Sequence, residues 1–290
     1  MELYELKYFL GVAKCENIHK ASESLGVSTA SLSKAVGRLE AELGVSLFHR
    51  ERRNIKLTDQ GRLLQRRASE MAQLEESTKL EVAGLPGTIQ VVIAGPEILL
   101  AKLGTELGAS IKRKFPKAVF DFHAAKEEEA IEQVDRGEAH LALVSGDIAL
   151  KEGLFAKTLL EEAKFQTFVG EKHPLFAAAK SKKMVAVEDV LKHAFVSPDN
   201  PMLGKVGAKQ ALDGWRDDKF PRKVEYLTSS LKILEELVVS GKAMAYLPSY
   251  FCDTLPVEYL KISGCPYSCV QKIRLIARNP KNTGWLNQIF

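Results

Sequence analysis

ASESLGVSTASLSKAVGRLEAELGVSLFHRERRNIKLTDQG, residues 21–61, is the stretch that decides the fold of the N-terminal part of the chain. With the residues before it, it predicts helices at Ile18–Leu25 and Thr29–Leu43, after an earlier helix at Tyr4–Ala13. Gly26 separates the second helix from the third, and its lack of a Cβ suits a tight turn. Two helices joined by a turn of about three or four residues form the geometry that places the second one in a DNA major groove.

The helix at Thr29–Leu43 has two different faces. Its apolar residues recur at three- and four-residue spacing and should pack on the first two helices: Leu32, Val36, Leu39 and Leu43. Its N-terminal exposed positions carry short hydroxyls and one cation, which are types that contact base edges and phosphates: Thr29, Ser31, Ser33 and Lys34, after the capping residue Ser28. The alternative is a solvated helix face in an unrelated three-helix bundle.

The segment after this helix predicts a two-stranded basic wing. Leu47 and Phe48 anchor one short strand, and Ile55 and Leu57 anchor the next. The turn between them carries three arginines, Arg50, Arg52 and Arg53. Residues 49–67 hold seven cationic side chains and two anionic ones, a net charge of +5, whereas the whole chain carries only +4. Such a wing fits a DNA minor groove, and the concentrated charge predicts contact with phosphate.

In their order and spacing, residues 3–62 resemble the DNA-binding domain of LysR-type transcriptional regulators. The matching elements are Phe9, the helix Ala21–Leu25, Val27-Ser28, Ser33-Lys34, Leu39-Glu40, Leu43-Gly44, Leu47-Phe48, Arg50, Arg53, Leu57-Thr58 and Gly61. The sequence departs from the family pattern at Asn17, His19 and Thr29, where Ser, Thr and Gln are usual. Gly37 lies inside the third helix, where it should cost about 1 kcal/mol relative to Ala. These departures bear on which bases are read.

The resemblance implies a sequence-specific, homo-oligomeric transcription factor that responds to a small molecule. We expect DNA contacts from Ser28, Thr29, Ser31, Ser33, Lys34, Arg38, Arg50, Arg52 and Arg53. The expected partners are double-stranded promoter or operator DNA, further copies of the chain in a homodimer or homotetramer, a small-molecule effector, and RNA polymerase.

Length and composition allow two or three domains of an ordinary globular protein. The chain has 290 residues, of which 46% are hydrophobic and 27% charged. No apolar run approaches the ~20 residues that a membrane helix needs. Glu2 and Glu5 at the start argue against a signal peptide. We therefore expect a cytoplasmic protein with no membrane partner.

A long helix is predicted after the wing, at Thr58–Gly84, with a length of ~40 Å. Residues at alternating steps of four and three form a heptad seam: Leu57, Gly61, Leu64, Ala68, Met71, Glu75 and Thr78. The resemblance implies that two copies of this helix pair antiparallel along the seam and form a dimer. Leu63 and Leu74 lie off the seam and could pack on the helix-turn-helix. The alternative is a single amphipathic helix that packs on its own domain.

Residues Gly84 to Gly87 read GLPG, which ends the long helix and predicts an interdomain hinge. The expected domains are a winged helix-turn-helix at 1–58, a linker helix and hinge at 59–87, and a regulatory domain at 88–290.

Strands and helices alternate in the regulatory half. Strands at Ile89–Ala94, Ala118–Ala124 and His140–Ser145 and helices at Ile98–Phe115 and Glu127–Arg136 give a βαβαβ order, which is typical of a parallel sheet. A second set follows, with strands at Phe165–Val169, Ala194–Ser197, Val224–Tyr226 and Ala243–Leu247 and helices around Leu175–Ala179, at Met202–Trp215 and at Ser230–Ser240. The chain should cross back near Ser263–Cys269 into a strand at Val270–Ala277. These elements predict an α/β effector domain that resembles periplasmic binding proteins and has two subdomains. Subdomain I is expected at 88–162 and 268–290, and subdomain II at 163–267.

Ligands of open α/β sheets bind beyond the carboxyl ends of the strands. Those ends supply the candidate effector residues: Gly95, Pro96, Glu97, Ser145, Asp147, Ser197, Asp199, Thr228 and Pro248. Each segment alone is more typical of a plain turn, and their convergence predicts a cleft between the subdomains. Glu97 opens a helix, where a carboxylate competes with an anionic ligand for the helix dipole. It either caps its own helix or favours a neutral or cationic effector. We expect no cofactor.

No catalytic constellation stands out, because four scattered histidines lack partners at metal or triad spacing: His123, His140, His173 and His193. We therefore expect no enzyme. Two alternatives stay open, an enzyme on a binding-protein-like fold, which leaves residues 1–60 unexplained, and an architectural DNA-binding protein with no effector. Cys265 and Cys269 form a C-x3-C, which is not a common zinc spacing. Both a thiol switch and a pair of inert cysteines remain possible.

Overall fold

The computed structural model describes residues 1–51, 54–82, 89–146, 150, 153–199, 213–252, 255–278, 285–286 and 289. Two compact units share the chain: Met1–Val92 with Ser110–Asp121 and Glu132–His140, and Ile93–Ala109 with Phe122–Ile131 and Leu141–Phe290. Outside the described residues lie Arg52, Arg53, Asp147, the predicted hinge at 84–87, and residues 202–212 of the predicted helix at 202–215. Among the described helices, none combines the length and the apolar character needed to cross a membrane.

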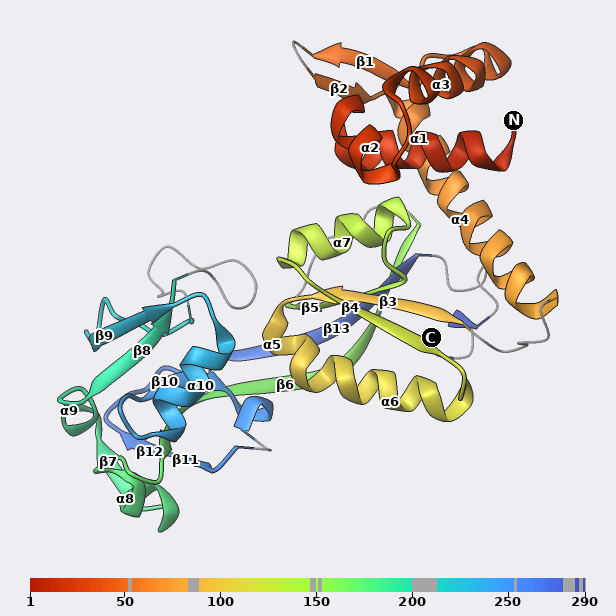
Figure 1. The fold of residues 1–290 in the computed structure, drawn as a ribbon. Coiled ribbons are helices and arrows are strands. Elements are labelled where there is room, and N and C mark those ends of the chain that lie inside the picture. Colours follow the sequence, from red (N-terminus) through yellow and green to blue (C-terminus); the bar gives the residue numbers. More distant parts are fainter. Residues whose placement is uncertain are drawn as a thin grey trace. The chain divides into compact units, whose positions relative to one another are not determined.

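The predicted helix-turn-helix is confirmed. Helices α1 (Leu3–Cys15), α2 (Ile18–Leu25) and α3 (Thr29–Leu43) form the N-terminal cluster in Figure 1. The α2 helix begins where the Asn17 side chain accepts backbone N–H bonds, and α3 begins where the Ser28 hydroxyl does the same. Both helices therefore start at the residues that their capping types predict.

Glycines end these two helices. Gly26 has φ 64° and Gly44 has φ 70°, which is the left-handed conformation that glycine adopts without a Cβ penalty. The turn between α2 and α3 is thus set by the backbone and places α3 across α1 and α2.

One apolar cluster joins helices α1 and α3 to the wing and to the helix that follows it. Its buried members are Leu6, Phe9, Ala13, Leu39, Leu47, Leu57 and Ala68. The rings of Phe9 and Phe48 lie 5.5 Å apart between centroids. Full burial of a large apolar side chain stabilises a fold by roughly 1.5–3 kcal/mol, so this cluster fixes the wing relative to α3.

The wing is a two-stranded antiparallel ribbon, with strands β1 (Phe48–Glu51) and β2 (Asn54–Leu57). The Glu40 carboxylate, near the end of α3, accepts the Leu47 N–H at 2.7 Å and the Phe48 N–H at 3.3 Å. The recognition helix and the first wing strand are therefore tied by a charged hydrogen-bond acceptor.

Helix α4 (Asp59–Val82) follows the wing and is about 36 Å long. The prediction that its Leu57–Leu64–Met71 seam forms a dimer interface is wrong for the first part of the seam. Ala68 is fully buried in the N-terminal core, and Leu64 packs against that core. Leu63 and Leu74, which lie off the seam and were free to pack on the helix-turn-helix, are 51% and 68% exposed. A heptad seam and the buried face of one amphipathic helix have the same short-range spacing, and here the helix uses that face on its own domain.

Gly61 is required at the junction between wing and α4. A Cβ at this position would lie 2.1 Å from the Leu47 carbonyl oxygen. That carbonyl also accepts the Thr58 N–H at 3.0 Å, so its position is fixed.

The first part of the regulatory half has the predicted βαβαβ order. Its elements are β3 (Gln90–Gly95), α5 (Glu97–Leu99), a π-helical turn (Leu100–Gly104), α6 (Thr105–Lys114), β4 (Val119–Ala124), α7 (Glu127–Arg136) and β5 (Leu141–Ser145). Strands β3 and β5 are parallel, as predicted. Figure 1 shows α6 on one side of these strands and α7 on the other.

Two long strands change the predicted parallel sheet into a mixed one. Strand β6 (Leu154–Gly170) begins 11 residues before its predicted start at Phe165, and it pairs antiparallel with β13 (Val270–Arg278). Strand β13 also pairs antiparallel with β5. The sheet order is β10-β6-β13-β5-β3-β4, with β11 also paired to β6. The expected subdomain boundary at 162/163 therefore falls inside one continuous strand.

The remaining elements are α8 (Phe176–Lys180), β7 (Met184–Ala186), α9 (Val187–Val190), β8 (Ala194–Pro198), β9 (Lys223–Thr228), α10 (Leu231–Val239), β10 (Ala245–Pro248), a 3-10 turn (Ser249–Cys252), β11 (Val257–Tyr259) and β12 (Lys261–Ser263). Strands β8 and β9 form a parallel pair, as do β7 and β12. The sequence did not predict β7, α9, β11 or β12, which are all three or four residues long.

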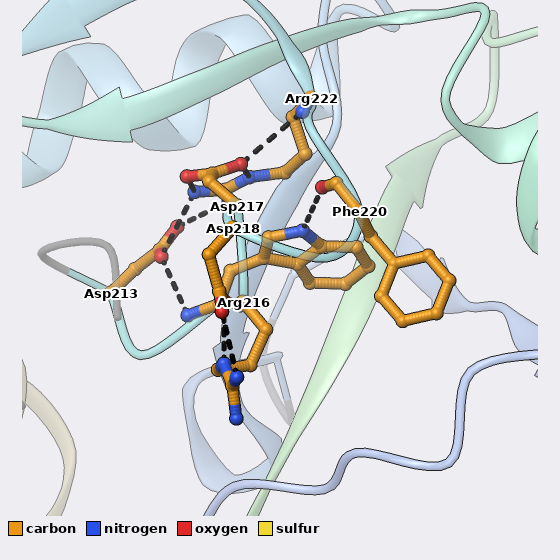
Figure 2. A network of polar contacts seen from close by, with 7 residues as sticks. Asp213, Arg216, Asp217, Asp218, Phe220 and Arg222 are labelled. Carbon is orange, nitrogen blue, oxygen red and sulfur yellow. Dashed lines mark hydrogen bonds and ion pairs between the residues drawn. The ribbon is translucent and has the colours of Figure 1, made fainter. Parts of the chain in front are cut away.

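A buried ionic network holds the segment before β9 (Figure 2). The Arg222 guanidinium donates to Asp213 at 2.6 and 3.2 Å and to Asp217 at 2.9 and 3.0 Å. It also lies 5.3 Å from the ring centroids of Phe195 and Trp215. The indole N–H of Trp215 donates to the Phe220 carbonyl at 2.8 Å, which joins the two ends of the turn at 215–220.

Candidate DNA interface and effector site

The start of the α3 helix presents a polar surface. Ser31, Ser33 and Lys34 are exposed, and Thr29 is half-buried. Among the described residues, Ser33 and Lys34 form no hydrogen bond or ion pair through their side chains. Their hydroxyl and ammonium groups are therefore unengaged and suited to DNA.

Three other predicted DNA contacts already have intramolecular partners. The Ser28 hydroxyl accepts the Ser31 N–H at 3.1 Å, and the two hydroxyls lie 2.9 Å apart. Arg38 donates to the Tyr4 hydroxyl at 3.0 Å and lies 3.6 Å from the Glu5 carboxylate. These contacts hold the start of α3 and its packing on α1, so DNA contact by Arg38 would compete with them.

Part of the basic charge around the wing is also paired. Lys56 lies 3.3 Å from Glu16, Arg62 lies 2.7 Å from Asp59, and Arg67 lies 3.1 Å from Glu70. Arg50 is exposed on β1, at the edge of the wing. The charge directed at DNA is therefore expected near Arg50 and the turn that follows it.

Two candidate effector residues lie on neighbouring parallel strands of the first sheet region. Gly95 ends β3, and a Cβ there would lie 2.7 Å from the Leu143 carbonyl of β5. Ser145 ends β5, is buried, and donates its backbone N–H to the Glu127 carboxylate at 2.9 Å. Pro96 is buried and Glu97 is exposed at the start of α5.

A second group of candidates lies at the ends of β8, β9 and β10. Ser197 and Pro248 are buried, and Asp199 is exposed. The Asp199 N–H donates to the Thr228 carbonyl at 3.1 Å, and the Thr228 hydroxyl accepts the Ser230 N–H at 3.0 Å. Thr228 therefore orients the start of α10, whose cap is Ser230.

Sequence reasoning missed two buried polar residues at these strand ends, Glu127 and Tyr250. Glu127 opens α7 and is 5% exposed, and Tyr250 follows β10 and is 7% exposed. The Tyr250 hydroxyl has no hydrogen-bond partner among the described residues. Burial raises the pKa of Tyr250 above its usual range, and the Glu127 charge adds to that rise. The strand-end rule would have found both, because Glu127 follows the strand at 118–124 and Tyr250 lies two residues beyond Pro248.

Two protein-family models match the chain. Residues 3–62 match the bacterial regulatory helix-turn-helix protein, lysR family, and residues 87–279 match the LysR substrate binding domain. The transcriptional dual regulator GltC of Bacillus subtilis is 29% identical over 266 residues, covering 90% of this chain and 86% of GltC. The hydrogen peroxide-inducible genes activator of Dickeya chrysanthemi is 23% identical over 276 residues, covering 93% of this chain and 85% of that protein.

Solved full-length regulators share the fold. OxyR C199D from Pseudomonas aeruginosa superposes with a TM-score of 0.62 at 20% identity, covering 99% of this chain and 94% of that one. LysG from Corynebacterium glutamicum, with bound effector Arg, gives 0.61 at 18% identity, covering 99% and 96%. CbnR complexed with its target DNA gives 0.55 at 17% identity, covering 99% and 98%. At these identities the likeness concerns the fold alone.

Proposed function

The chain belongs to the family of LysR-type transcriptional regulators, and we propose specific roles for its residues in DNA reading, self-association and effector binding. It is a DNA-binding regulator and not an enzyme. The observation that carries the DNA proposal is the exposed Ser33–Lys34 surface on α3, which has no intramolecular partner among the described residues. Hydroxyl and ammonium groups at this point of a helix-turn-helix read base edges and phosphates.

A salt titration with two duplexes tests this role. One duplex carries the promoter region beside the protein's own gene, and the other is random. Lys34→Ala should reduce discrimination between them by about 1–3 kcal/mol if Lys34 contacts a base. Lys242→Ala removes the same charge from an exposed turn of the regulatory half and serves as the control. Equal loss on both duplexes would reassign Lys34 to phosphate contact, and no loss would remove it from the interface.

We propose that self-association uses the exposed face of α4, which shares only Met71 with the predicted seam. Leu63, Met71, Leu74 and Val82 are 51%, 41%, 68% and 83% exposed and form an apolar stripe along the helix. A dimer would bury this stripe and hold two recognition helices at a fixed spacing on DNA. The stripe supports at least a homodimer, and a homotetramer would need a second interface.

Light scattering on single variants tests this surface. Leu74→Glu should give smaller species that remain folded by circular dichroism, because it places a charge in the proposed contact. Leu43→Glu, at a 41% exposed leucine of α3, is the control and should leave the size unchanged. Leu64→Glu should instead unfold the N-terminal domain, because Leu64 packs on its core. An unchanged oligomer in Leu74→Glu would place the interface elsewhere.

The effector proposal places a small molecule, and no cofactor, at the carboxyl ends of the regulatory strands. The buried Ser145 and Ser197 and the exposed Asp199 support it, because such strand ends are where ligands of this fold class bind. Calorimetry on the intact protein tests it, since Ser145→Ala or Ser197→Ala should weaken binding of any compound that alters its DNA affinity. Unchanged binding in both variants would move the site.

We propose that the protein acts in the cytoplasm, where promoter DNA lies, and that RNA polymerase is the partner through which it would activate transcription. In vitro transcription with purified polymerase tests this last partner: a change in transcript yield on adding the protein supports it, and unchanged yield on a bound promoter contradicts it.

A further inference from the structure

Glu40 organises the turn that joins the recognition helix α3 to the wing. Its backbone carbonyl accepts the N–H groups of Gly44 and Val45 at 2.9 and 3.3 Å, where α3 ends. Its carboxylate oxygen Oε1 accepts the N–H groups of Leu47 and Phe48 at 2.7 and 3.3 Å, where β1 begins. One residue of α3 therefore fixes four backbone N–H groups of the turn that leads to the wing.

Thr58 holds the same turn from its other side. Its N–H donates to the Leu47 carbonyl at 3.0 Å, and its hydroxyl donates to the Ser46 carbonyl at 2.7 Å. Strand β2 is anchored separately, because the Ile55 N–H donates to the Glu16 carbonyl at 3.2 Å. The backbone that leads into β1 is thus set between two anchors, and the anchor that belongs to α3 is Glu40.

The wing depends on such anchors because it is small. It is a ribbon of two strands paired at four positions, and an isolated ribbon of this kind is marginally stable. Arg50 lies two residues beyond Phe48 on β1, about 7 Å along a strand that rises ~3.3 Å per residue, so a rotation of about 10° at Phe48 would displace Arg50 by about 1 Å. A displacement of that size breaks a hydrogen bond, whose donor–acceptor distance spans only about 2.7–3.2 Å.

We propose that Glu40 is a positioning residue for DNA binding, which orients β1 so that Arg50 reaches the DNA when α3 lies in the major groove. This inference rests on the proposed DNA interface, and it adds the residue that sets where the wing contact falls. A carboxylate in the last turn of a helix is unfavourable for the helix dipole. The charge of Glu40 therefore does not serve α3 itself, and its contribution is to accept the N–H groups of Leu47 and Phe48.

A double-mutant cycle with Arg50 on the promoter duplex tests this role. Arg50→Ala should weaken binding by the wild type on the order of tenfold, the effect of losing a charged hydrogen bond. In Glu40→Ala the same change should cost less than about threefold, because a displaced Arg50 has little contact to lose. Glu40→Gln keeps an oxygen acceptor for the two N–H groups and should restore the full effect of Arg50→Ala.

Two controls separate positioning from charge and from general damage. Glu42→Ala removes a carboxylate of the same helix, whose ion partner is the amino group of Met1, and it should leave the effect of Arg50→Ala unchanged. Lys34 lies in the first half of α3, before the anchored turn. Lys34→Ala should therefore weaken binding by the same factor in the wild type and in Glu40→Ala.

Circular dichroism and thermal unfolding show whether each variant is folded. If Glu40→Ala does not fold, Glu40→Asp replaces it, because it keeps the charge and withdraws the carboxylate by one methylene group. Equal effects of Arg50→Ala in the wild type and in the folded variant would overturn the inference, as would a wild type in which Arg50→Ala has no effect. DNA binding itself stands in both cases, and sequence-specific reading fails separately if the wild type binds promoter and random duplexes alike.

Discussion

Replacing Arg222 with methionine should destabilise the protein by about 3–5 kcal/mol, the usual effect of removing one partner of a buried ion pair. The Arg222 side chain is 0% exposed and donates four hydrogen bonds to Asp213 and Asp217. Methionine replaces most of the apolar stem but none of these donors. It leaves the Asp213 carboxylate, which is only 1% exposed, without a counter-charge.

Arg216→Met is the matched control for this effect. Arg216 also makes a two-pronged contact, to Asp218 at 2.6 and 2.8 Å, but the two side chains are 24% and 30% exposed. Pairs that solvent reaches contribute about 0–1 kcal/mol. Because both variants remove an arginine with a bidentate carboxylate partner, six residues apart, the difference between them measures the effect of burial.

Urea unfolding and thermal unfolding of the full-length protein, both followed by tryptophan fluorescence, provide the assay. Trp215 is buried, and its ring centroid lies 5.1 Å from that of Tyr246. Its fluorescence therefore reports on the unfolding of this region. The melting temperature of Arg222→Met should fall by about 10 °C, and that of Arg216→Met by a few degrees at most. If the two variants unfold within about 1 kcal/mol of each other, the buried charges do not hold this segment and the reasoning is refuted.

Two further predictions concern stability elsewhere in the chain. Burial lowers the pKa of His173 to about 4, so the unfolded state binds more protons between about pH 6.5 and 4 and stability should fall by up to about 3 kcal/mol as the pH drops through that range. His173→Asn, which keeps an acceptor for the Leu175 N–H, should flatten that part of the stability profile, and an unchanged slope in urea titrations at several pH values would exclude His173 as its source. Gly61→Ala should destabilise by about 1–3 kcal/mol, because its Cβ meets the Leu47 carbonyl oxygen at 2.1 Å. Gly37→Ala meets nothing within 4 Å and should stabilise α3 by about 0.4–1 kcal/mol, so opposite shifts in melting temperature are expected and equal shifts would contradict the argument.

Local chemistry made the N-terminal domain predictable. The Asn17 and Ser28 side chains cap the starts of their helices, and Gly26 ends α2 in a left-handed conformation. These capping interactions all lie within a few residues of each other in sequence. The face of α4 was not predictable in this way. Its seam spacing reports that one side is buried but not whether the covering surface is the same chain or a second copy. Only the packing of Leu64 and Ala68 on the N-terminal core decided it.

The effector residues illustrate a second limit. Ser145 and Ser197 follow apolar strands directly, so the strand-end rule found them. The regulatory strands β5 and β10 are joined by β13 and β6, which pair at residues more than 100 positions apart in sequence. Local patterns carry little information on such long-range pairing, which is also why residues 154–164 were not predicted as part of a strand.

The continuous strand β6 has a consequence for how the regulatory half can move. Its residues pair with β13 up to Lys164 and with β10 from Phe165 onward, so the crossing between the two halves is a strand paired on both sides of one irregular stretch. A loop hinge would swing freely, but a paired ribbon resists bending across its plane and yields mainly to twist. The irregular register of β13 between Gln271 and Arg274 is where such twist would concentrate. An effector signal carried by this ribbon would therefore be a rotation of small amplitude, and the amides of Ala163 to Phe165 should stay protected from hydrogen exchange throughout it.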